Sequence, residues 1–265
     1  MKTGIVGCAG RMGRMLVAEV LSNKDLSLVG GTEHEESSCI GQDIASLVGF
    51  DEVGIDVGCN MQDLFKSADV VIDFTLPKAT VLHAEAAINH GTALVIGTTG
   101  LSRNQQSFVE EASKTVPIVQ AANYSLGVNL LLGLTSEVAS LLEDDYDIEI
   151  SEMHHRHKID APSGTALALG QAAADGRGVD LDSVSNLNRN DMPRAREEGG
   201  IGFSSMRGGD VVGDHTVIFA TDGERIELTH KASSRSIFAR GAVRSAIWCK
   251  DKSPGLYSIR DVLGI

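Results

Sequence analysis

Five consecutive residues can all carry positive charge: His154, His155, Arg156, His157 and Lys158. Gathering five cations costs electrostatic free energy, so an anionic ligand that relieves the repulsion would stabilise the segment. A histidine or a desolvated lysine can also donate the proton that follows hydride delivery to a conjugated C=N or C=C bond. We therefore expect His154 and Lys158 to be the catalytic proton donors.

The residues after this basic run are suited to holding a carboxylate. Ser163, Gly164 and Thr165 follow Pro162 and stand where a helix is expected to begin. Backbone N–H groups and hydroxyls at a helix start are oriented donors for an anion. The segment 154–165 therefore predicts a binding site for a small acid.

Two other interpretations of the basic run stay open. His154 and His157 could ligate a metal, but Arg156 and Lys158 would repel a cation and no His-Glu-x-x-His order is present. A solvated loop is the ordinary interpretation of a charge run, although the adjoining Pro-Ser-Gly-Thr turn argues against it. We expect no bound metal.

A second constellation lies near the N-terminus. Gly7, Gly10 and Gly13 follow a short apolar strand and open a helix, and Glu33 stands 20 residues further on. Glycines at this spacing permit a tight turn, close approach of a pyrophosphate and close helix packing, while the carboxylate can accept from ribose hydroxyls. A glycine-rich turn with an unrelated surface glutamate is the alternative. The combined pattern predicts a dinucleotide site.

The elements needed to position these groups alternate through residue 122. We expect strands at 4–7, 26–31, 70–74, 93–97 and 117–121, and helices at 12–21, 78–89 and 103–114. This order is typical of a Rossmann-like, doubly wound parallel sheet, hence an α/β fold. Residues 97–100 (Gly-Thr-Thr-Gly) would lie at the ligand-binding sheet edge, although a plain turn capped by Ser102 also fits.

A second, α+β domain with a mostly antiparallel or mixed sheet is expected after a boundary at 123–127. Its predicted elements are helices at 128–142 and 165–174 and strands at 148–150, 201–206, 215–220 and 225–231. The segment 176–200 is expected to be a long mobile connection, and a last helix runs near 238–246, before Pro254.

Composition limits the classes of partner. The 265 residues suit two domains, and 23 Lys plus Arg against 36 Asp plus Glu give a net charge of -13, which disfavours nucleic acid. The four cysteines show no paired spacing, and neither a signal peptide nor a membrane span is evident. We expect a cytoplasmic protein with no membrane partner.

The motifs together resemble those of the dihydrodipicolinate (4-hydroxy-tetrahydrodipicolinate) reductase family. The resemblance rests on residues 154–158 and 160–166, the glycine loop 7–13, and the blocks 97–100, 121–129 and 241–244. It covers nearly the whole chain in the same order. It implies NAD(P)H-dependent reduction of 4-hydroxy-tetrahydrodipicolinate to tetrahydrodipicolinate with loss of water, in lysine and diaminopimelate biosynthesis.

The resemblance also implies roles for individual residues. His154 would act as acid and base and Lys158 as proton donor, while His155, Gly164 and Thr165 hold the carboxylates of a small dicarboxylate. Domain 1–125, with 236–265 returning to it, would bind the dinucleotide, and 126–235 would bind substrate and form a homotetramer. The implied cofactor contacts are Gly7, Cys8, Ala9, Gly10, Arg11, Met12, Glu33, His34, Gly97, Thr98, Thr99, Ala121, Ala122, Asn123 and Tyr124.

One departure concerns the choice between NADH and NADPH. Many family members have an arginine after the ribose-binding glutamate, whereas this chain has His34. Histidine lacks the bidentate fork and permanent charge that would bind a 2′-phosphate, so NADPH affinity is in doubt. Two other functions remain alternatives: a dehydrogenase of the aspartate or homoserine type, or a non-catalytic NAD(P)H sensor.

Overall fold

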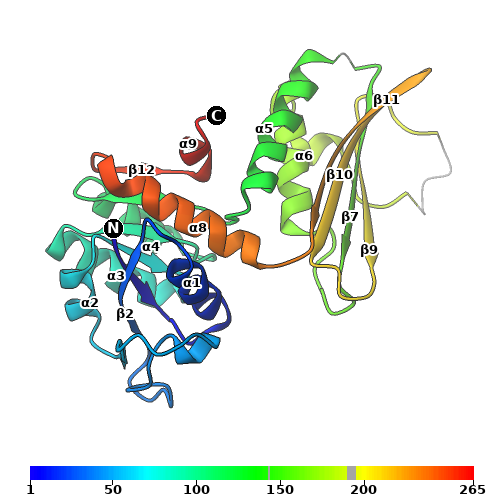
Figure 1. The fold of residues 1–265 in the computed structure, drawn as a ribbon. Coiled ribbons are helices and arrows are strands. Elements are labelled where there is room, and N and C mark those ends of the chain that lie inside the picture. Colours follow the sequence, from blue (N-terminus) through cyan, green and yellow to red (C-terminus); the bar gives the residue numbers. More distant parts are fainter. Residues whose placement is uncertain (143, 190–194) are drawn as a thin grey trace. The chain divides into compact units, whose positions relative to one another are not determined.

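The computed structural model describes residues 1–142, 144–189 and 195–265. The chain divides into two compact units. Unit 1 comprises Met1–Leu126 and Ser236–Gly264, and unit 2 comprises Gly127–Arg235 with Ile265. Each unit has its own sheet and its own hydrophobic core, so the two are described in turn (Figure 1).

Unit 1 contains a seven-stranded sheet in the order β12-β6-β5-β4-β1-β2-β3. Every pairing between these strands is parallel, and the strand order reverses between β4 and β1, as in doubly wound folds. The strands are β1 (Lys2–Val6), β2 (Ser27–Thr32), β3 (Val57–Gly58), β4 (Val70–Asp73), β5 (Ala93–Ile96), β6 (Pro117–Gln120) and β12 (Gly255–Tyr257). The predicted fold class is confirmed.

Helices cover both faces of this sheet because alternate residues of each strand point to opposite sides. Ile5 packs with α1 (Arg11–Leu21), α8 (Ser236–Trp248) and α9 (Ile259–Leu263). Its neighbour Val6 packs in a second cluster with α2 (Met61–Ser67), α3 (Pro77–His90) and α4 (Arg103–Ser113). Strands buried on both sides explain the continuous apolar runs in the sequence.

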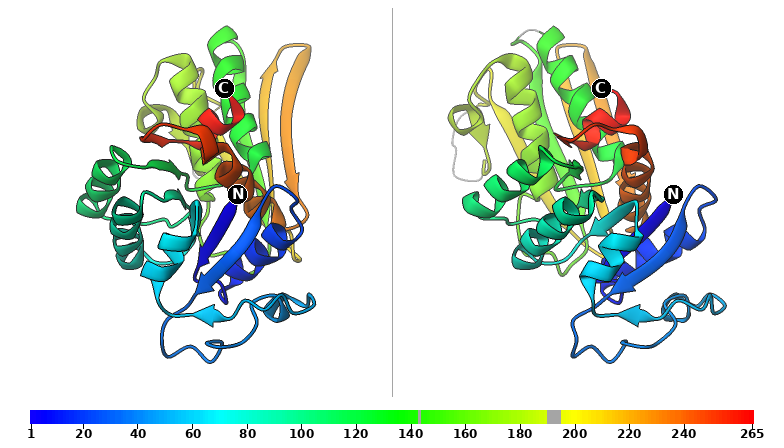
Figure 2. Two further views of the ribbon diagram at one scale, coloured as in Figure 1. Left: turned by 60° about the vertical axis from the view of Figure 1, so that its left-hand side comes forward. Right: turned by 90° about the vertical axis from the view of Figure 1, so that its left-hand side faces the viewer.

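Unit 2 contains a mixed five-stranded sheet in the order β11-β10-β7-β9-β8. The strands are β7 (Asp147–His154), β8 (Ser185–Asn186), β9 (Ile201–Arg207), β10 (Gly213–Thr221) and β11 (Glu224–Ala232). β10 pairs antiparallel with β7 and β11, whereas β7, β9 and β8 are mutually parallel. Figure 2 shows β10 and β11 as a long hairpin, drawn in yellow-orange and orange.

Two long helices of unit 2, α5 (Leu126–Leu141) and α6 (Gly164–Arg177), supply its core together with one face of the sheet. In β7 the core face is taken by every second residue: Ile148, Ile150, Glu152 and His154. The first two are apolar, but the last two are ionisable. The apolar core therefore gives way to a polar site at the carboxyl end of β7.

The structure differs from the sequence predictions in short elements. The 3-10 helix η1 (Ser46–Val48), β3 and α2 were not predicted, nor was β12, which pairs with β6, followed by α9. The segment 176–200 is not one long connection, because α6 continues to Arg177 and α7 (Leu181–Val184) and β8 follow it. Positions 143 and 190–194, the latter within the predicted connection 176–200, lie outside the described residues.

Candidate functional site

The glycine loop of unit 1 joins β1 to α1. Gly7 has a φ of +66°, and a Cβ on Gly13 would lie 2.0 Å from the Gly7 carbonyl oxygen. Only glycine fits at either place. The N-cap of α1 is Gly10, whose lack of a side chain leaves the amino end of the helix without a side-chain cap. Such a helix start presents N–H groups and a positive dipole end to a phosphate.

A cavity of about 230 Å³ lies beyond the carboxyl ends of the strands of unit 1. Its lining includes five predicted cofactor residues together with two phenylalanines that sequence reasoning missed. Gly97 is required there because a Cβ would lie 2.2 Å from the ring of Phe74. The lining residues are Met12, Phe74, Gly97, Ala122, Asn123, Tyr124 and Phe238.

The hydroxyl of Tyr124 contacts main-chain carbonyl groups of the protein and not the cavity. Its ring is buried beside Phe74, and the hydroxyl lies 2.9 Å from the carbonyl oxygens of both Ile96 and Val119. Burial raises the pKa of this phenol well above its ordinary value. Any contact of Tyr124 with a cofactor therefore has to come from its ring or its main chain.

Glu33 follows β2 and reaches the glycine loop. Its carboxylate accepts a hydrogen bond of 2.7 Å from the backbone N–H of Ala9. The neighbouring His34 is exposed, and its Nδ1 accepts from the N–H of Glu36 at 3.3 Å. The carboxylate of Glu33 therefore lies at the edge of the glycine loop, and the residue next to it is a histidine instead of an arginine.

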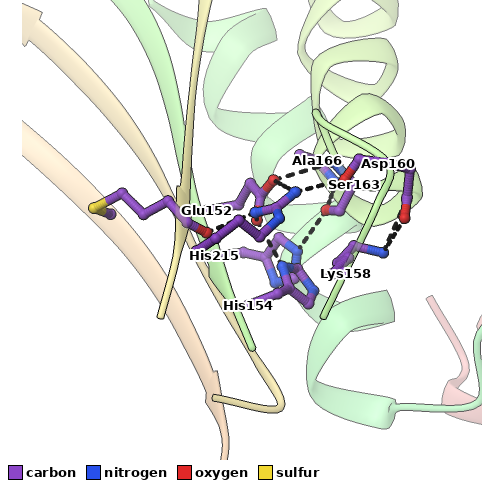
Figure 3. Close-up of polar contacts among 9 residues, drawn as sticks. Glu152, His154, Lys158, Asp160, Ser163, Ala166 and His215 are labelled. Atoms are coloured by element: carbon purple, nitrogen blue, oxygen red, sulfur yellow. Dashed lines mark hydrogen bonds and ion pairs between the residues drawn. The ribbon is translucent and has the colours of Figure 1, made fainter. Parts of the chain in front are cut away.

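In unit 2 the central group is Glu152, a residue that sequence reasoning did not single out. Its side chain is 1% exposed and accepts a bidentate pair of bonds from Arg207 at 2.8 and 2.9 Å. It also accepts from His154 Nδ1 at 2.6 Å and from the N–H of Ser163 at 3.2 Å (Figure 3). Burial alone would raise the pKa of Glu152, but the hydrogen bonds from Arg207 and His154 lower it to about 2.

A second histidine, His215 on β10, lies next to His154, with the two rings edge to face and 5.1 Å apart. Its Nε2 lies 3.1 Å from the hydroxyl of Ser163, which accepts from the N–H of Ala166 and so caps α6. Burial, followed by the nearby charge of His154, lowers the pKa of His215 to about 4. His215 is therefore neutral at physiological pH and braces the amino end of α6.

Lys158, the second predicted proton donor, is ion-paired. Its Nζ donates to both carboxylate oxygens of Asp160 at 2.8 Å (Figure 3). The hydrogen bond from Lys158 lowers the pKa of Asp160. Arg207 donates to the carbonyl oxygen of Asp160 as well, so the same guanidinium joins the loop to Glu152.

Two of the three predicted carboxylate-binding residues, Gly164 and Thr165, lie at the amino end of α6. Gly164 is the first helical residue and is exposed, and Thr165 follows it in the first turn. His155 has a buried Nδ1 that meets no hydrogen-bond partner within the described part of the chain. His157 is exposed and lies with its ring 6.3 Å from that of His155.

The described residues contain no group of three or more His, Cys, Asp or Glu side chains arranged to hold a metal ion. They also contain no helix both long enough and apolar enough to cross a membrane.

The fold and sites define a class, the dinucleotide-binding oxidoreductases, and comparison with known proteins defines the family. Residues 1–124 match the model "Dihydrodipicolinate reductase, N-terminus", and residues 127–263 match "Dihydrodipicolinate reductase, C-terminus". The 4-hydroxy-tetrahydrodipicolinate reductase of Magnetococcus marinus is 50% identical over 264 residues, covering 100% of this chain and 98% of the relative. That of Dinoroseobacter shibae is 51% identical over 261 residues, or 98% and 97%.

Solved structures agree with these matches. A dipicolinate-bound dihydrodipicolinate reductase from Paenisporosarcina sp. TG-14 superposes with a TM-score of 0.78 at 26% identity, covering 97% of each chain. An amine dehydrogenase from Mycobacterium smegmatis, with a TM-score of 0.67 at 12% identity over 97% and 94% of the chains, shares the fold alone. The chain belongs to the dihydrodipicolinate reductase family, and the predicted resemblance is confirmed.

Proposed function

We propose that this chain catalyses the NAD(P)H-dependent reduction of 4-hydroxy-tetrahydrodipicolinate to tetrahydrodipicolinate and water. The observation that carries the proposal is identity of about half over the full length of relatives that bear the name of this reductase. The reaction consumes one 4-hydroxy-tetrahydrodipicolinate, one NAD(P)H and one proton, and it releases tetrahydrodipicolinate, NAD(P)+ and water. The dehydrogenase and sensor alternatives have no comparable support.

On the substrate side, His154 acts as the acid and base and Lys158 as a further proton donor. His155, Gly164 and Thr165 hold the carboxylates. The start of α6 supports this assignment, as does the buried Nδ1 of His155, which has no hydrogen-bond partner among the described residues. Lys158 has to exchange its partner Asp160 for a substrate anion, which an exposed carboxylate permits at small cost.

On the cofactor side, the dinucleotide binds along the glycine loop and over the cavity of unit 1. When bound, the reduced nicotinamide supplies the hydride. Gly7 to Met12 hold the pyrophosphate, and Glu33 accepts from ribose hydroxyls, in keeping with its place beside Ala9. The remaining contacts come from Gly97, Thr98, Thr99, Ala121, Ala122, Asn123 and Tyr124, of which four line the cavity.

We further propose that NADH is used at least as well as NADPH, because Glu33 repels a 2′-phosphate and His34 offers no permanent charge to compensate. His34→Arg should shift the preference toward NADPH, mainly by lowering its KM. The measurement is kcat/KM for both cofactors in wild type, His34→Arg and His34→Ala. A strong NADPH preference that survives in His34→Ala would mean that another cation, such as Arg11 or Lys24, binds the phosphate.

The protein is proposed to act in the cytoplasm on a small dicarboxylate, as a homotetramer, without nucleic acid, membrane or metal. An exposed apolar side chain, Met206, lies on the face of the unit 2 sheet away from its core and supports an oligomer formed through this face. Light scattering on the purified protein measures the assembly directly. A monomer at micromolar concentration would contradict the tetramer.

The activity is tested by following NADH and NADPH oxidation at 340 nm with the product of dihydrodipicolinate synthase. Aspartate semialdehyde, and oxaloacetate plus ammonia, serve as parallel substrates for the competing dehydrogenase activities. We expect turnover with the synthase product alone. Turnover with either of the other substrates, or with none, would overturn the proposal.

A further inference from the structure

The Glu152 carboxylate makes four close contacts in a fixed pattern, and the side chain of Ser205 bonds to it as well. One carboxylate oxygen accepts from Arg207 at 2.9 Å and from the N–H of Ser163 at 3.2 Å. The other oxygen accepts from Arg207 at 2.8 Å and lies 2.6 Å from His154 Nδ1. Since the guanidinium and the backbone N–H can only donate, the carboxylate is held ionised and acts as acceptor in all four contacts.

This pattern determines which nitrogen of His154 carries a proton. An ionised carboxylate can only accept, so His154 Nδ1 must be the donor across the 2.6 Å contact. The neutral imidazole is then the Nδ1–H tautomer, and Nε2 is the nitrogen that gains and loses a proton. In serine proteases a buried carboxylate bonded to the catalytic histidine has this same effect on its tautomer.

A glycine lies against Nε2 of His154. Gly213, the first residue of β10, lies beside His154, and a Cβ at this position would stand 2.9 Å from Nε2. Real Cβ atoms do not approach a neighbour so closely, so any other residue would push against the nitrogen. The strand that covers this side of His154 therefore begins at the one residue type that places no side chain against Nε2.

Glu152, His154 and Arg207 come from two neighbouring strands of one sheet. Glu152 and His154 are two apart in β7 and share its core face, and Arg207 is paired with His154 in the register of β7 and β9. Arg207 thus reaches across the end of the sheet to Glu152. The position of the carboxylate is set by sheet register rather than by a loop.

We propose that Glu152 is a positioning residue for the reduction: anchored by Arg207, it holds His154 in the Nδ1–H tautomer and directs Nε2 toward the substrate. The role assigned to His154 rests on the proposed function, whereas the tautomer does not. The competing account is that Glu152 and Arg207 form a structural ion pair that merely joins β7 to β9.

Glu152→Gln distinguishes a positioning role from a purely structural ion pair. A carboxylate has two accepting oxygens, whereas an amide replaces one of them with a donating NH₂ group. The amide oxygen will face Ser163 N–H and Arg207 Nη2, because both of these groups can only donate. The amide NH₂ then faces His154 Nδ1, and Arg207 Nη1, which donated to that position, has to move away. Nδ1 then becomes an acceptor and the neutral tautomer inverts to Nε2–H. Loss of the adjacent negative charge also makes the imidazolium less stable, so His154 protonates at lower pH.

The first readout is the tautomer, measured by long-range 15N–1H NMR of histidine-labelled protein, with the His154 signal assigned from His154→Gln. We expect Nδ1–H in wild type and Nε2–H in Glu152→Gln. The matched control is Glu149→Gln, which breaks an ion pair between Arg196 and the same strand without touching His154. An unchanged tautomer in folded Glu152→Gln would overturn the proposal, and a wild-type Nε2–H tautomer would do the same.

The second readout is the pH profile of kcat/KM. We expect a fall of about 10²-fold in kcat for Glu152→Gln, with the alkaline limb moved to lower pH, and no change for Glu149→Gln. Gly213→Ala should lower kcat while keeping the wild-type tautomer. If Glu152→Gln does not fold, Glu152→Asp, which keeps the charge, replaces it: a retained Nδ1–H tautomer supports the proposal and an inverted one contradicts it. If wild type lacks activity with the synthase product, the proposed function fails, while the NMR result still decides the positioning role.

Discussion

Each unit of this protein contains a buried carboxylate paired with the Nδ1 of a histidine. In unit 1, Asp73 at the end of β4 is 0% exposed and lies 2.9 Å from His83 on α3. In unit 2, Glu152 is 1% exposed and lies 2.6 Å from His154. The two pairs have the same chemical groups in nearly the same geometry, yet they are built into different surroundings.

The surroundings show how one motif serves two purposes. Within the described residues Asp73 pairs with His83 but with no lysine or arginine. It also bonds to Thr75 and Thr98, which tie together the loops after β4 and β5. Its histidine stacks on Phe65 inside the core. Glu152 has the permanent charge of Arg207, and Gly213 places no side chain against the far nitrogen of its histidine. The first pair can hold a scaffold together, whereas the second can exchange a proton with a ligand.

The largest difference between the pairs should appear in catalysis. We expect His154→Gln to lower kcat by about 10²-fold or more because it removes the proton donor, with little loss of folded structure. His83→Gln should leave kcat within about twofold and lower the melting temperature instead. Steady-state kinetics and thermal unfolding of both variants make the comparison. Equal losses of kcat would abolish the distinction drawn between the pairs.

The scaffold pair should show its effect in stability and cofactor binding. Asp73→Ala leaves the partners of a buried charge unsatisfied, so we expect the free energy of unfolding to fall by about 3–5 kcal/mol. The KM for NADH should rise as the loop carrying Gly97 relaxes, and the KM for the dicarboxylate should not. Asp73→Asn, which can keep the threonine bonds, is the control expected to retain most stability. Urea unfolding and steady-state kinetics measure these quantities. A free energy of unfolding and a KM for NADH equal to those of wild type in Asp73→Ala would refute the prediction.

The difference between the pairs could be predicted from sequence only in part. The glycine loop and the basic run follow from local residue patterns, because each motif sits on a single turn or strand end. Glu152 was overlooked, although its alternation with Ile148 and Ile150 places a carboxylate at a core position and could have signalled it. Arg207 and His215 could not be found in this way, because their contacts depend on how distant strands pair.

The stability of the protein should depend on pH through His215. Burial lowers the pKa of this histidine to about 4, while an unfolded histidine titrates near ~6.5. Between these values the unfolded chain binds more protons, so the free energy of unfolding should fall as pH is lowered, by at most about 1.4 kcal/mol per pH unit. His215→Gln should reduce this slope in urea unfolding between pH 6.5 and 4.5. An unchanged slope would show that another group is responsible.

Substitution of Thr165, which is proposed to hold the substrate independently of the Glu152–His154 pair, should have a smaller effect than the changes above. Thr165→Val removes one hydroxyl at the start of α6, so the KM for the dicarboxylate should rise by about 10-fold, with kcat changed less. The KM for NADH should stay the same. A KM for the dicarboxylate equal to that of wild type would move the carboxylate site toward His155.

If the two pairs differ as described, the imidazole of His154 contacts the substrate and that of His83 does not. An NMR titration of histidine-labelled protein with dipicolinate, the ligand named in the solved relative from Paenisporosarcina, tests this. We expect the His154 and His155 signals to shift in proportion to bound ligand and the His83 signal to stay in place. Saturation with dipicolinate that leaves His154 unchanged, or shifts His83 as far as His154, would contradict it.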